Sequence, residues 1–213
     1  FIVVFTISRG FEALPYLNFF TQDMSLAGPL DPLSSGGILH SILGSLIQIA
    51  IALAITIPLG LITAVFLNEI PGKYSRFVRT MVEAMTALPS IVAGLFIFAV
   101  LILPFAKSGN PLFGYNGFMA SLALAITMLP TITRTVEVVL RLVPDGLREA
   151  SLALGASRAR TVWSVVFPTA KTGMTTAVVL GIARAVGETA PLLFTAFGYD
   201  LMNSNPFAGS QES

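Results

Sequence analysis

Charged residues are scarce in this chain of 213 residues: only 11% are Asp, Glu, Lys or Arg, whereas 54% are hydrophobic. Soluble globular domains carry roughly 25% charged residues, so this composition excludes a soluble fold. No Asp, Glu, Lys or Arg lies between Asp31 and Glu69, between Glu83 and Lys107, or between Lys107 and Arg134. Each stretch exceeds the roughly 20 residues that a helix needs to cross a bilayer. The sequence therefore predicts a polytopic membrane protein.

Other absences narrow the possible functions. The chain contains no cysteine, which excludes disulfides, zinc–thiolate sites and iron–sulfur clusters, and its single histidine, His40, excludes a multi-histidine metal site. The net charge of +1 gives no electrostatic reason to expect a nucleic-acid partner. The sequence lacks G-x-x-x-x-G-K-[ST], a loop that cradles the phosphates of ATP. Any ATP hydrolysis linked to this chain is therefore expected in another subunit.

Long apolar blocks bounded by Gly, Pro or charged residues predict an all-α bundle of transmembrane helices. Four blocks cover residues 38–67, 78–103, 117–140 and 168–197. None alternates polar and apolar residues as a barrel strand would. The apolar run 1–7 is interpreted as the end of a further helix whose beginning is cut off. Pro58 inside the first block and Pro89 inside the second predict kinks.

Basic residues are concentrated in two of the connections. Segment 68–79 contains three Lys or Arg residues and segment 141–160 contains four, whereas segment 104–116 contains only Lys107. By the positive-inside rule, the first two connections face the cytoplasm. Segment 8–37 and the C-terminal tail then lie outside, and the five predicted spans fit one alternating topology.

The cytoplasmic segment 143–168 is longer than a connection requires and has a pattern of its own. Asp145 is placed to cap a short helix, Gly155 to end it, and Ser157 to cap the next helix. Small and apolar residues at helical spacing form one face of the first helix: Leu147, Ala150, Ser151 and Leu154. Such a face suits docking into a partner's groove, and it equally suits a helix lying on the lipid surface. The pattern alone leaves both interpretations open.

The same segment resembles a known motif. Glu149-Ala150-Ser151, three residues, Gly155, nine residues and Val165-x-Phe167-Pro168 follow the spacing E-A-A-x3-G-x9-I-x-L-P of the EAA loop. That loop is typical of permease subunits of ABC importers, where it forms the coupling helix that sits in a groove of a separate ATPase subunit. The resemblance implies a coupling role for Glu149, Ala150, Ser151, Leu154, Gly155 and Ala156.

Charges also lie inside the predicted spans. Arg184 and Glu188 are four residues apart in the last span, a spacing that predicts an ion pair, and Arg134 and Glu137 occupy the inner part of the preceding span. A charge at the bilayer centre costs about 2.5–3.5 kcal/mol on insertion scales. These residues are therefore candidates for a transport pathway or, alternatively, for a salt bridge within a packed bundle. Small residues every four positions predict close helix packing beside Arg184: Gly173, Ala177, Gly181 and Ala185.

A guanidinium in such a position suits a tetrahedral oxyanion, because its planar fork donates two hydrogen bonds at once. This chemistry does not distinguish phosphate from sulfate or molybdate. Longer motifs resemble the PstA-type permease family of phosphate ABC importers: Ala87-Leu88-Pro89-Ser90, Leu129-Pro130-x3-Arg134-Thr135-x-Glu137 and Gly187-Glu188-Thr189-Ala190-Pro191-Leu192-Leu193. The resemblance implies phosphate as the substrate and a pathway that contains Arg184, Glu188, Arg134, Glu137 and Thr189.

The resemblance also implies an architecture and partners. Residues 1–213 would form one transmembrane permease domain of the type I importer fold, with a core at about 38–197 and the coupling loop at 143–168. Family permeases have six membrane helices, so the first helix would be truncated and the sixth missing. The implied setting is a bacterial or archaeal inner membrane. The implied partners are a second permease of the PstC type, two ATPase subunits of the PstB type, an external phosphate-binding protein of the PstS type, and lipid. This chain would bind no cofactor and would be no enzyme, since ATP is used by its partner.

Other functions make different demands on the same residues. A permease for sulfate or molybdate would share them. A channel or an ion-coupled secondary carrier would use Arg184 and Glu188 but would not need the docking face. An enzyme would need a nucleophile and a base at matching depth, and Ser90 and Glu83 lie about 10 Å apart along one predicted helix.

Overall fold

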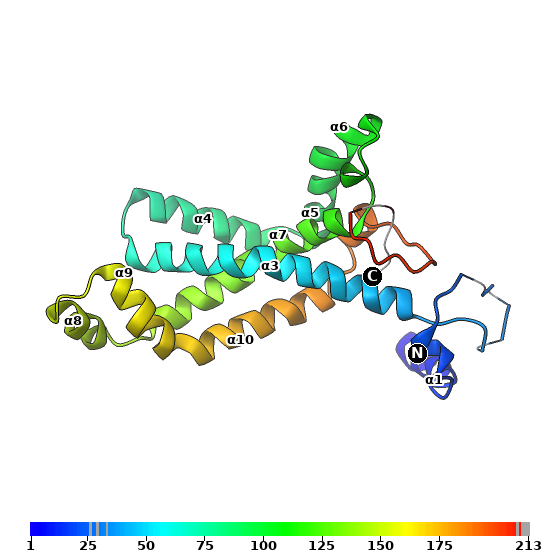
Figure 1. Cartoon of the computed structure of the whole chain (residues 1–213), viewed down its shortest axis with the longest axis horizontal. Helices are drawn as coiled ribbons and strands as arrows, with labels where there is room; N and C mark the ends of the chain where they lie inside the picture. Colours follow the sequence, from blue (N-terminus) through cyan, green and yellow to red (C-terminus); the bar gives the residue numbers. More distant parts are fainter. Residues whose placement is uncertain (26, 29, 33, 208, 210–213) are drawn as a thin grey trace. The chain divides into compact units, whose positions relative to one another are not determined.

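The computed structural model describes residues 1–25, 27–28, 30–32, 34–207 and 209, and all of its regular elements are helical (Figure 1). The chain forms two compact units. Unit 1 contains Phe1–Ala50, Gly94–Ala123 and Thr189–Ser213, and unit 2 contains Ile51–Ala93 and Leu124–Glu188. Unit 1 thus holds the segments predicted to face outside, and unit 2 holds both connections predicted to face the cytoplasm.

Three helices in the described residues are long and apolar enough to cross a membrane. They are α3 (Leu39–Glu69), α7 (Gly117–Arg141) and a continuous helix over Arg158–Val186, in which α9 (Arg158–Thr161) and a π-helical turn lead into α10 (Phe167–Val186). They confirm three of the predicted spans. The last span is shorter than predicted, because Gly187 caps α10 and the nearby Pro191 has no N–H with which to continue a helix.

The span predicted over 78–103 is not one continuous helix, and the kink predicted at Pro89 is confirmed as a sharp bend. The chain forms α4 (Lys73–Ala87) and then a second arm of α5 (Ser90–Ile97), a π-helical turn and α6 (Leu103–Phe105), and the two arms are bent by 105°. Leu88 is extended, with φ −72° and ψ 130°, because the ring of Pro89 disfavours helical geometry at the preceding residue. The two arms together make either one broken span or a re-entrant loop.

Unit 1 begins with α1 (Ile2–Phe11), an apolar helix of ten residues that is too short to span a bilayer. Further along, Met202 N–H donates to the Asp23 carboxylate at 3.1 Å, which connects the segment before α3 to the C-terminal tail. The Ser25 hydroxyl also donates to this carboxylate, at 2.6 Å. These hydrogen bonds, that of the Ser25 hydroxyl foremost, lower the pKa of Asp23 below its ordinary value.

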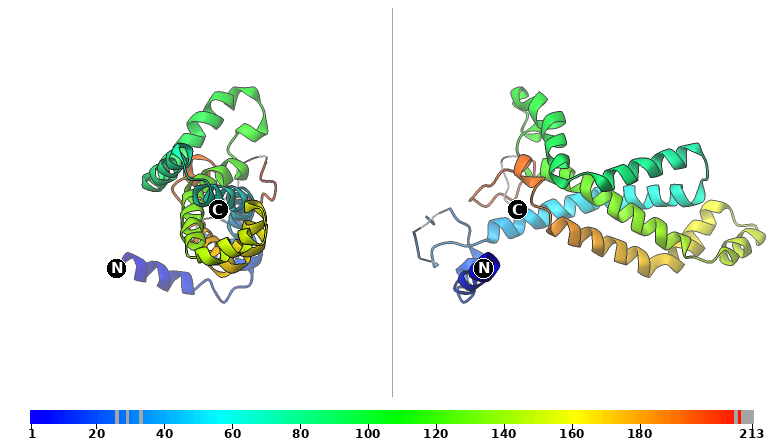
Figure 2. Two further views of the ribbon diagram at one scale, coloured as in Figure 1. Left: turned by 90° about the vertical axis from the view of Figure 1, so that its left-hand side faces the viewer. Right: turned by 180° about the vertical axis from the view of Figure 1, so that it is seen from behind.

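The core of unit 2 is built along α7. Buried residues recur there every four positions, so one helix face is covered throughout: Leu124, Met128, Ile132, Val136 and Leu140. A Cβ at Gly181 of α10 would lie 2.8 Å from Ile132, and one at Gly60 of α3 would lie 2.9 Å from it, so both helices approach α7 closely. Figure 2 shows α7 and α10 running side by side. The small residues of the last span pack against a neighbouring helix, as predicted.

Candidate functional site

The segment predicted to be cytoplasmic forms α8 (Asp145–Ala153), a turn and α9. The predicted N-cap is wrong: Pro144 is the N-cap, with the extended angles φ −56° and ψ 134°, and Asp145 is the first helical residue. Asp145 still stabilises α8, because its negative charge lies in the first turn. The end of α8 confirms the sequence prediction, since Gly155 adopts φ +85° and the side chain of Ser157 accepts a hydrogen bond from Arg160 N–H (3.3 Å) at the start of α9.

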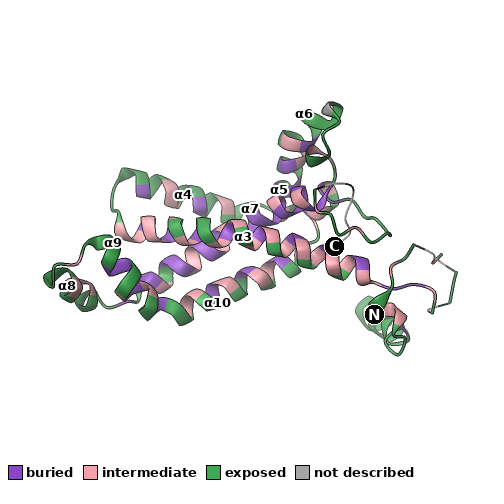
Figure 3. Ribbon diagram, in the orientation of Figure 1, coloured by how far each residue is buried: buried purple, intermediate pink, exposed green. Residues whose placement is uncertain are grey.

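The predicted docking face of α8 is open. Leu154 is 90% exposed and Leu147 is also exposed, so the two leucines of this face are uncovered in the described part of the chain (Figure 3). Ser151 is half-buried, and its hydroxyl lies 2.9 Å from that of Thr161 on α9. The other predicted coupling residues are exposed or half-buried: Glu149, Ala150, Gly155 and Ala156.

Arg148 attaches α8 to the ends of two membrane helices. Its guanidinium pairs with Glu69, the last residue of α3, and donates to the carbonyl oxygen of Leu140, near the end of α7, at 2.8 Å. The side chains of Arg148 and Glu69 are 16% and 22% exposed, so water screens the pair only in part. Sequence reasoning misses this pair, because the two residues are 79 positions apart and no periodic pattern connects them.

The predicted Arg134 and Glu137 meet in a larger cluster around one buried carboxylate. Glu137 is 2% exposed, and one of its oxygens lies 2.7 Å from Arg79 of α4 and 2.5 Å from Arg141. Its other oxygen accepts a hydrogen bond from Arg134 at 3.2 Å, and Arg134 also donates to Glu83 of α4 at 2.8 Å. Three guanidiniums therefore share two carboxylates. The spacing of Glu137 and Arg141 could have revealed that pair in the sequence, but no local pattern reveals Arg79 or Glu83.

The predicted Arg184–Glu188 pair is present. Arg184 lies in the last turn of α10, Glu188 follows the helix end, and Nε lies 3.4 Å from the carboxylate. The contact is an ion pair, and the buried Nε has no hydrogen-bond partner among the described residues. Thr189 follows in the chain, is exposed and belongs to unit 1. In the part of the chain that the structure describes, no ion pair connects Arg184 or Glu188 to the Glu137 cluster.

The chemistry of these groups is that of anion contact, because a guanidinium donates paired hydrogen bonds to an oxyanion. Arg134 and Arg184 are only partly buried and each is held by a carboxylate. Among the described residues, no group of three His, Cys, Asp or Glu side chains is arranged to hold a metal ion.

Comparisons with known sequences place these features in a family context. Residues 56–206 match the family described as "Binding-protein-dependent transport system inner membrane component". The chain is 41% identical to phosphate transport system permease protein PstA of Mycobacterium leprae over 208 residues and 97% of its length. It is 40% identical to PstA 1 of Mycobacterium tuberculosis (strain CDC 1551 / Oshkosh), again over 97%, and 34% identical to PstA of Haemophilus influenzae, over 95%. It spans 66%, 66% and 68% of the lengths of these relatives.

A solved structure shares the fold. The MetNI methionine ABC transporter, in an inward-facing native crystal form, superimposes with a TM-score of 0.55 at 25% sequence identity. The match covers 71% of this chain and 68% of the MetNI chain. A second crystal form of the same transporter gives a TM-score of 0.56 over the same shares.

Proposed function

The chain belongs to the family of binding-protein-dependent transport system inner membrane components, and we propose that it forms one permease half of an ATP-driven importer of inorganic phosphate. The family places it in the inner membrane as a transport subunit and not as an enzyme. One observation carries the proposed coupling to ATP: α8 is a short helix with an uncovered apolar face, held on the ends of two membrane helices by Arg148. The PstA relatives support phosphate as the substrate.

The exposed face of α8 is proposed to dock in a groove of a separate ATPase subunit. Leu154 supplies the apolar anchor, and Ala150, Ser151 and Ala156 are small enough for close approach. Gly155 lets the chain turn back directly behind the helix, and Glu149 is an exposed charge on α8. The alternative, that α8 rests on lipid, is less favoured because Arg148, the basic residue of α8, is turned toward Glu69 and not outward.

The anion is proposed to pass the two guanidinium groups in turn. Arg184 with Glu188, together with the neighbouring Thr189, and Arg134 with Glu137 are the pathway residues. In each group a carboxylate holds the arginine while no anion is present and opposes prolonged binding of one, which favours passage over trapping.

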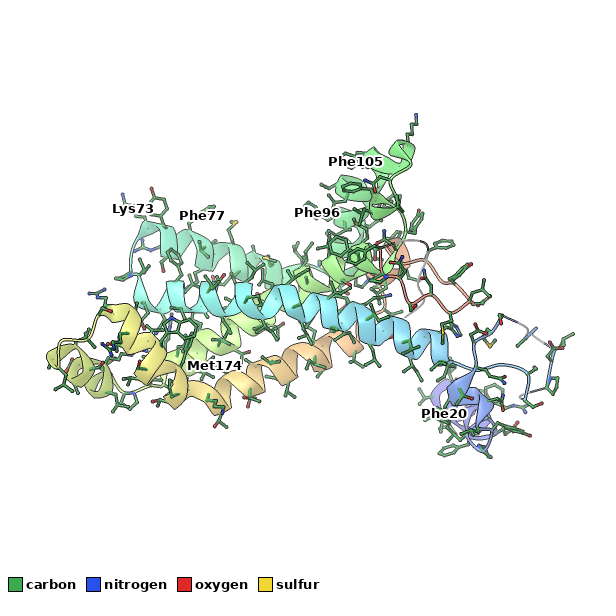
Figure 4. The ribbon with its side chains drawn as sticks, viewed as in Figure 1. Phe20, Lys73, Phe77, Phe96, Phe105 and Met174 are labelled. Carbon is green, nitrogen blue, oxygen red and sulfur yellow. The ribbon has the colours of Figure 1, made fainter. Side chains whose placement is uncertain are left out.

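Uncovered helix surfaces support the proposed partners. In the most apolar stretch of α7, 56% of the residues are buried, whereas the corresponding share is 22% in α3 and in the helix over Arg158–Val186. Large apolar side chains such as Phe77 of α4 and Phe96 of α5 are also exposed (Figure 4). Lipid and a second permease of the PstC type are proposed to cover these surfaces. A pair of PstB-type ATPases would hydrolyse the ATP, and an external PstS-type protein would deliver phosphate.

The proposed domain follows the same family. Residues 1–213 form one permease domain with its core at about 38–197 and the coupling loop at 143–168. The chain spans 66% of the length of the PstA relatives from Mycobacterium leprae and Mycobacterium tuberculosis.

A second candidate is import of another oxyanion, sulfate or molybdate, because the guanidinium chemistry does not discriminate among tetrahedral anions. The experiment that tests both is uptake of labelled phosphate, sulfate or molybdate into vesicles that hold the full-length protein with its ATPase and second permease. ATP-dependent phosphate uptake that is lost in Arg184→Gln and Gly155→Asp, and kept in the exposed control Arg76→Gln, supports the proposal. Uptake of sulfate or molybdate in place of phosphate overturns the assignment of phosphate as the substrate. Uptake without ATP favours an ion-coupled carrier.

A further inference from the structure

Two arginines bridge the same pair of helix ends in unit 2. Arg79 of α4 donates to the carbonyl oxygen of Leu67 in α3 at 3.3 Å and pairs with Glu137 of α7 at 2.7 Å. Arg148 of α8 pairs with Glu69 of α3 and donates to the carbonyl oxygen of Leu140 of α7 at 2.8 Å. Each guanidinium therefore contacts one carboxylate and one backbone carbonyl, and each connects α3 with α7.

The chemistry of these bridges suits a firm mechanical link. The last carbonyls of a helix have no partner within the helix and carry a partial negative charge, which a cation satisfies. The planar guanidinium offers donors in two directions at once, whereas the ammonium of lysine is a compact point charge. The low exposure of Arg148 and Glu69 protects their pair from solvent screening.

The two bridges differ in where their arginines come from. Arg79 belongs to α4, which follows α3 in the chain after a short turn. Arg148 belongs to α8 and is followed directly by Glu149, the first residue of the EAA-like motif. A partner that pushes on the docking face of α8 therefore moves the helix to which Arg148 belongs. Arg79 connects α3 with α7 without involving α8.

We infer that Arg148 is a positioning residue that passes displacement of α8 to α3 and α7 through Glu69 and the carbonyl of Leu140. This inference rests on the proposed function, since it gives α8 an external partner to move it. The contact between Ser151 and Thr161 links α8 to α9, and residues 142–144 join α8 to α7 through the backbone. The side chain of Arg148 adds the connection from α8 to α3 and a second one to α7.

The first test is the number of ATP molecules hydrolysed per phosphate imported, measured in vesicles with the complete complex. Arg148→Gln removes the charge and is expected to raise this ratio about fivefold or more, the lower end of the usual range for coupled sites. Glu69→Gln should raise it less, because the bond to Leu140 remains, and Arg148→Lys should fall between the two. Arg76→Gln, an exposed arginine of the same cytoplasmic side, is the matched control and should leave the ratio unchanged. A wild-type ratio in Arg148→Gln overturns the inference.

A second test needs neither ATP nor phosphate. Residues 1–213 contain no cysteine, so Leu152→Cys on α8 and Ile70→Cys after α3 provide two sites for spin labels in the full-length protein once any cysteine outside these residues is replaced. A narrow distance distribution is expected with Arg148 present and with Arg76→Gln, and a broad one with Arg148→Gln or, more weakly, Arg148→Lys. An equally narrow distribution in these Arg148 variants contradicts the inference. Absence of phosphate uptake in the wild type contradicts the proposed function alone, and the distances still decide whether Arg148 holds α8.

Discussion

Replacing Glu137 by glutamine tests how the arginine cluster is held together. The amide keeps the shape of the side chain and removes its charge, so Arg79, Arg134 and Arg141 lose their shared counter-charge. Removing one partner of a fully buried pair costs about 3–5 kcal/mol, whereas exposed pairs are worth about 0.2–1 kcal/mol each. The three arginine side chains are 33%, 39% and 52% exposed, so the pair with Arg79 dominates and the other two add little. A total loss of about 3 kcal/mol is expected, or about a hundredfold in the folding equilibrium.

The assay is unfolding in mixed detergent micelles, with SDS as the denaturant and helix content as the readout. Glu83→Gln is the matched control, because Glu83 is 48% exposed and, among the described residues, pairs only with Arg134. It should cost less than about 1 kcal/mol. If Glu137→Gln costs no more than Glu83→Gln, the buried carboxylate does not organise the cluster and the reasoning is wrong.

Three further changes test other features, the first two by the same unfolding assay in micelles and the third by thermal unfolding at different pH values. Gly173→Ala should lower the free energy of unfolding by about 1–3 kcal/mol, because the added Cβ would lie 2.5 Å from Val139 on α7. Gly146→Ala, whose Cβ would have nothing within 4 Å, should leave stability unchanged or raise it. Equal losses in the two variants would contradict the close packing. Gly155→Ala should cost about 1–2 kcal/mol from its φ of +85° alone, since nothing lies within 4 Å of the added Cβ, and an unchanged stability would contradict that conformation. Because the folded pKa of Asp23 is lowered, its contribution to stability is present above about pH 3.9 and is lost as the pH falls through the folded pKa. Asp23→Asn should therefore remove an acid-dependent step from thermal unfolding, and persistence of that step would assign it to another group.

The prolines show why the spans were only partly predictable. Pro58 and Pro130 lie inside α3 and α7, and neither ends its helix, whereas Pro89 separates two arms bent by 105°. Pro89 and Pro130 have nearly the same neighbours, Leu88-Pro89-Ser90-Ile91 and Leu129-Pro130-Thr131-Ile132, so the local sequence does not distinguish the broken helix from the continuous one. A membrane helix tolerates proline where neighbouring groups satisfy the freed backbone, and that depends on packing. Sequence reasoning therefore predicted the apolar blocks and a kink at Pro89, but not that the helix is broken there into two arms.

For the charged residues too, contacts between close neighbours in the sequence were predictable and contacts between different helices were not. The Arg184–Glu188 pair, the turn at Gly155 and the cap at Ser157 follow from spacings of four residues or fewer, and the structure confirms all three. The contacts of Arg79 with Glu137 and of Arg148 with Glu69 join different helices, so they depend on the tertiary arrangement. Positive charge in two connections predicted the orientation of the chain in the membrane. It did not predict that two of those arginines, Arg79 and Arg148, pair with carboxylates of other helices.

These two arginines also bear on the proposed pathway. Arg79 contacts Glu137 and a backbone carbonyl, and Arg148 contacts Glu69 and a backbone carbonyl. An anion could bind either guanidinium only by displacing one of these contacts. Arg134, by contrast, is shared between two carboxylates, one of which is about half exposed. An incoming anion at Arg134 need displace only Glu83, an exchange of one negative group for another that leaves the buried Glu137 in place. Exchange of this kind costs little in either direction, which is the property that a path requires and that a tight binding site lacks.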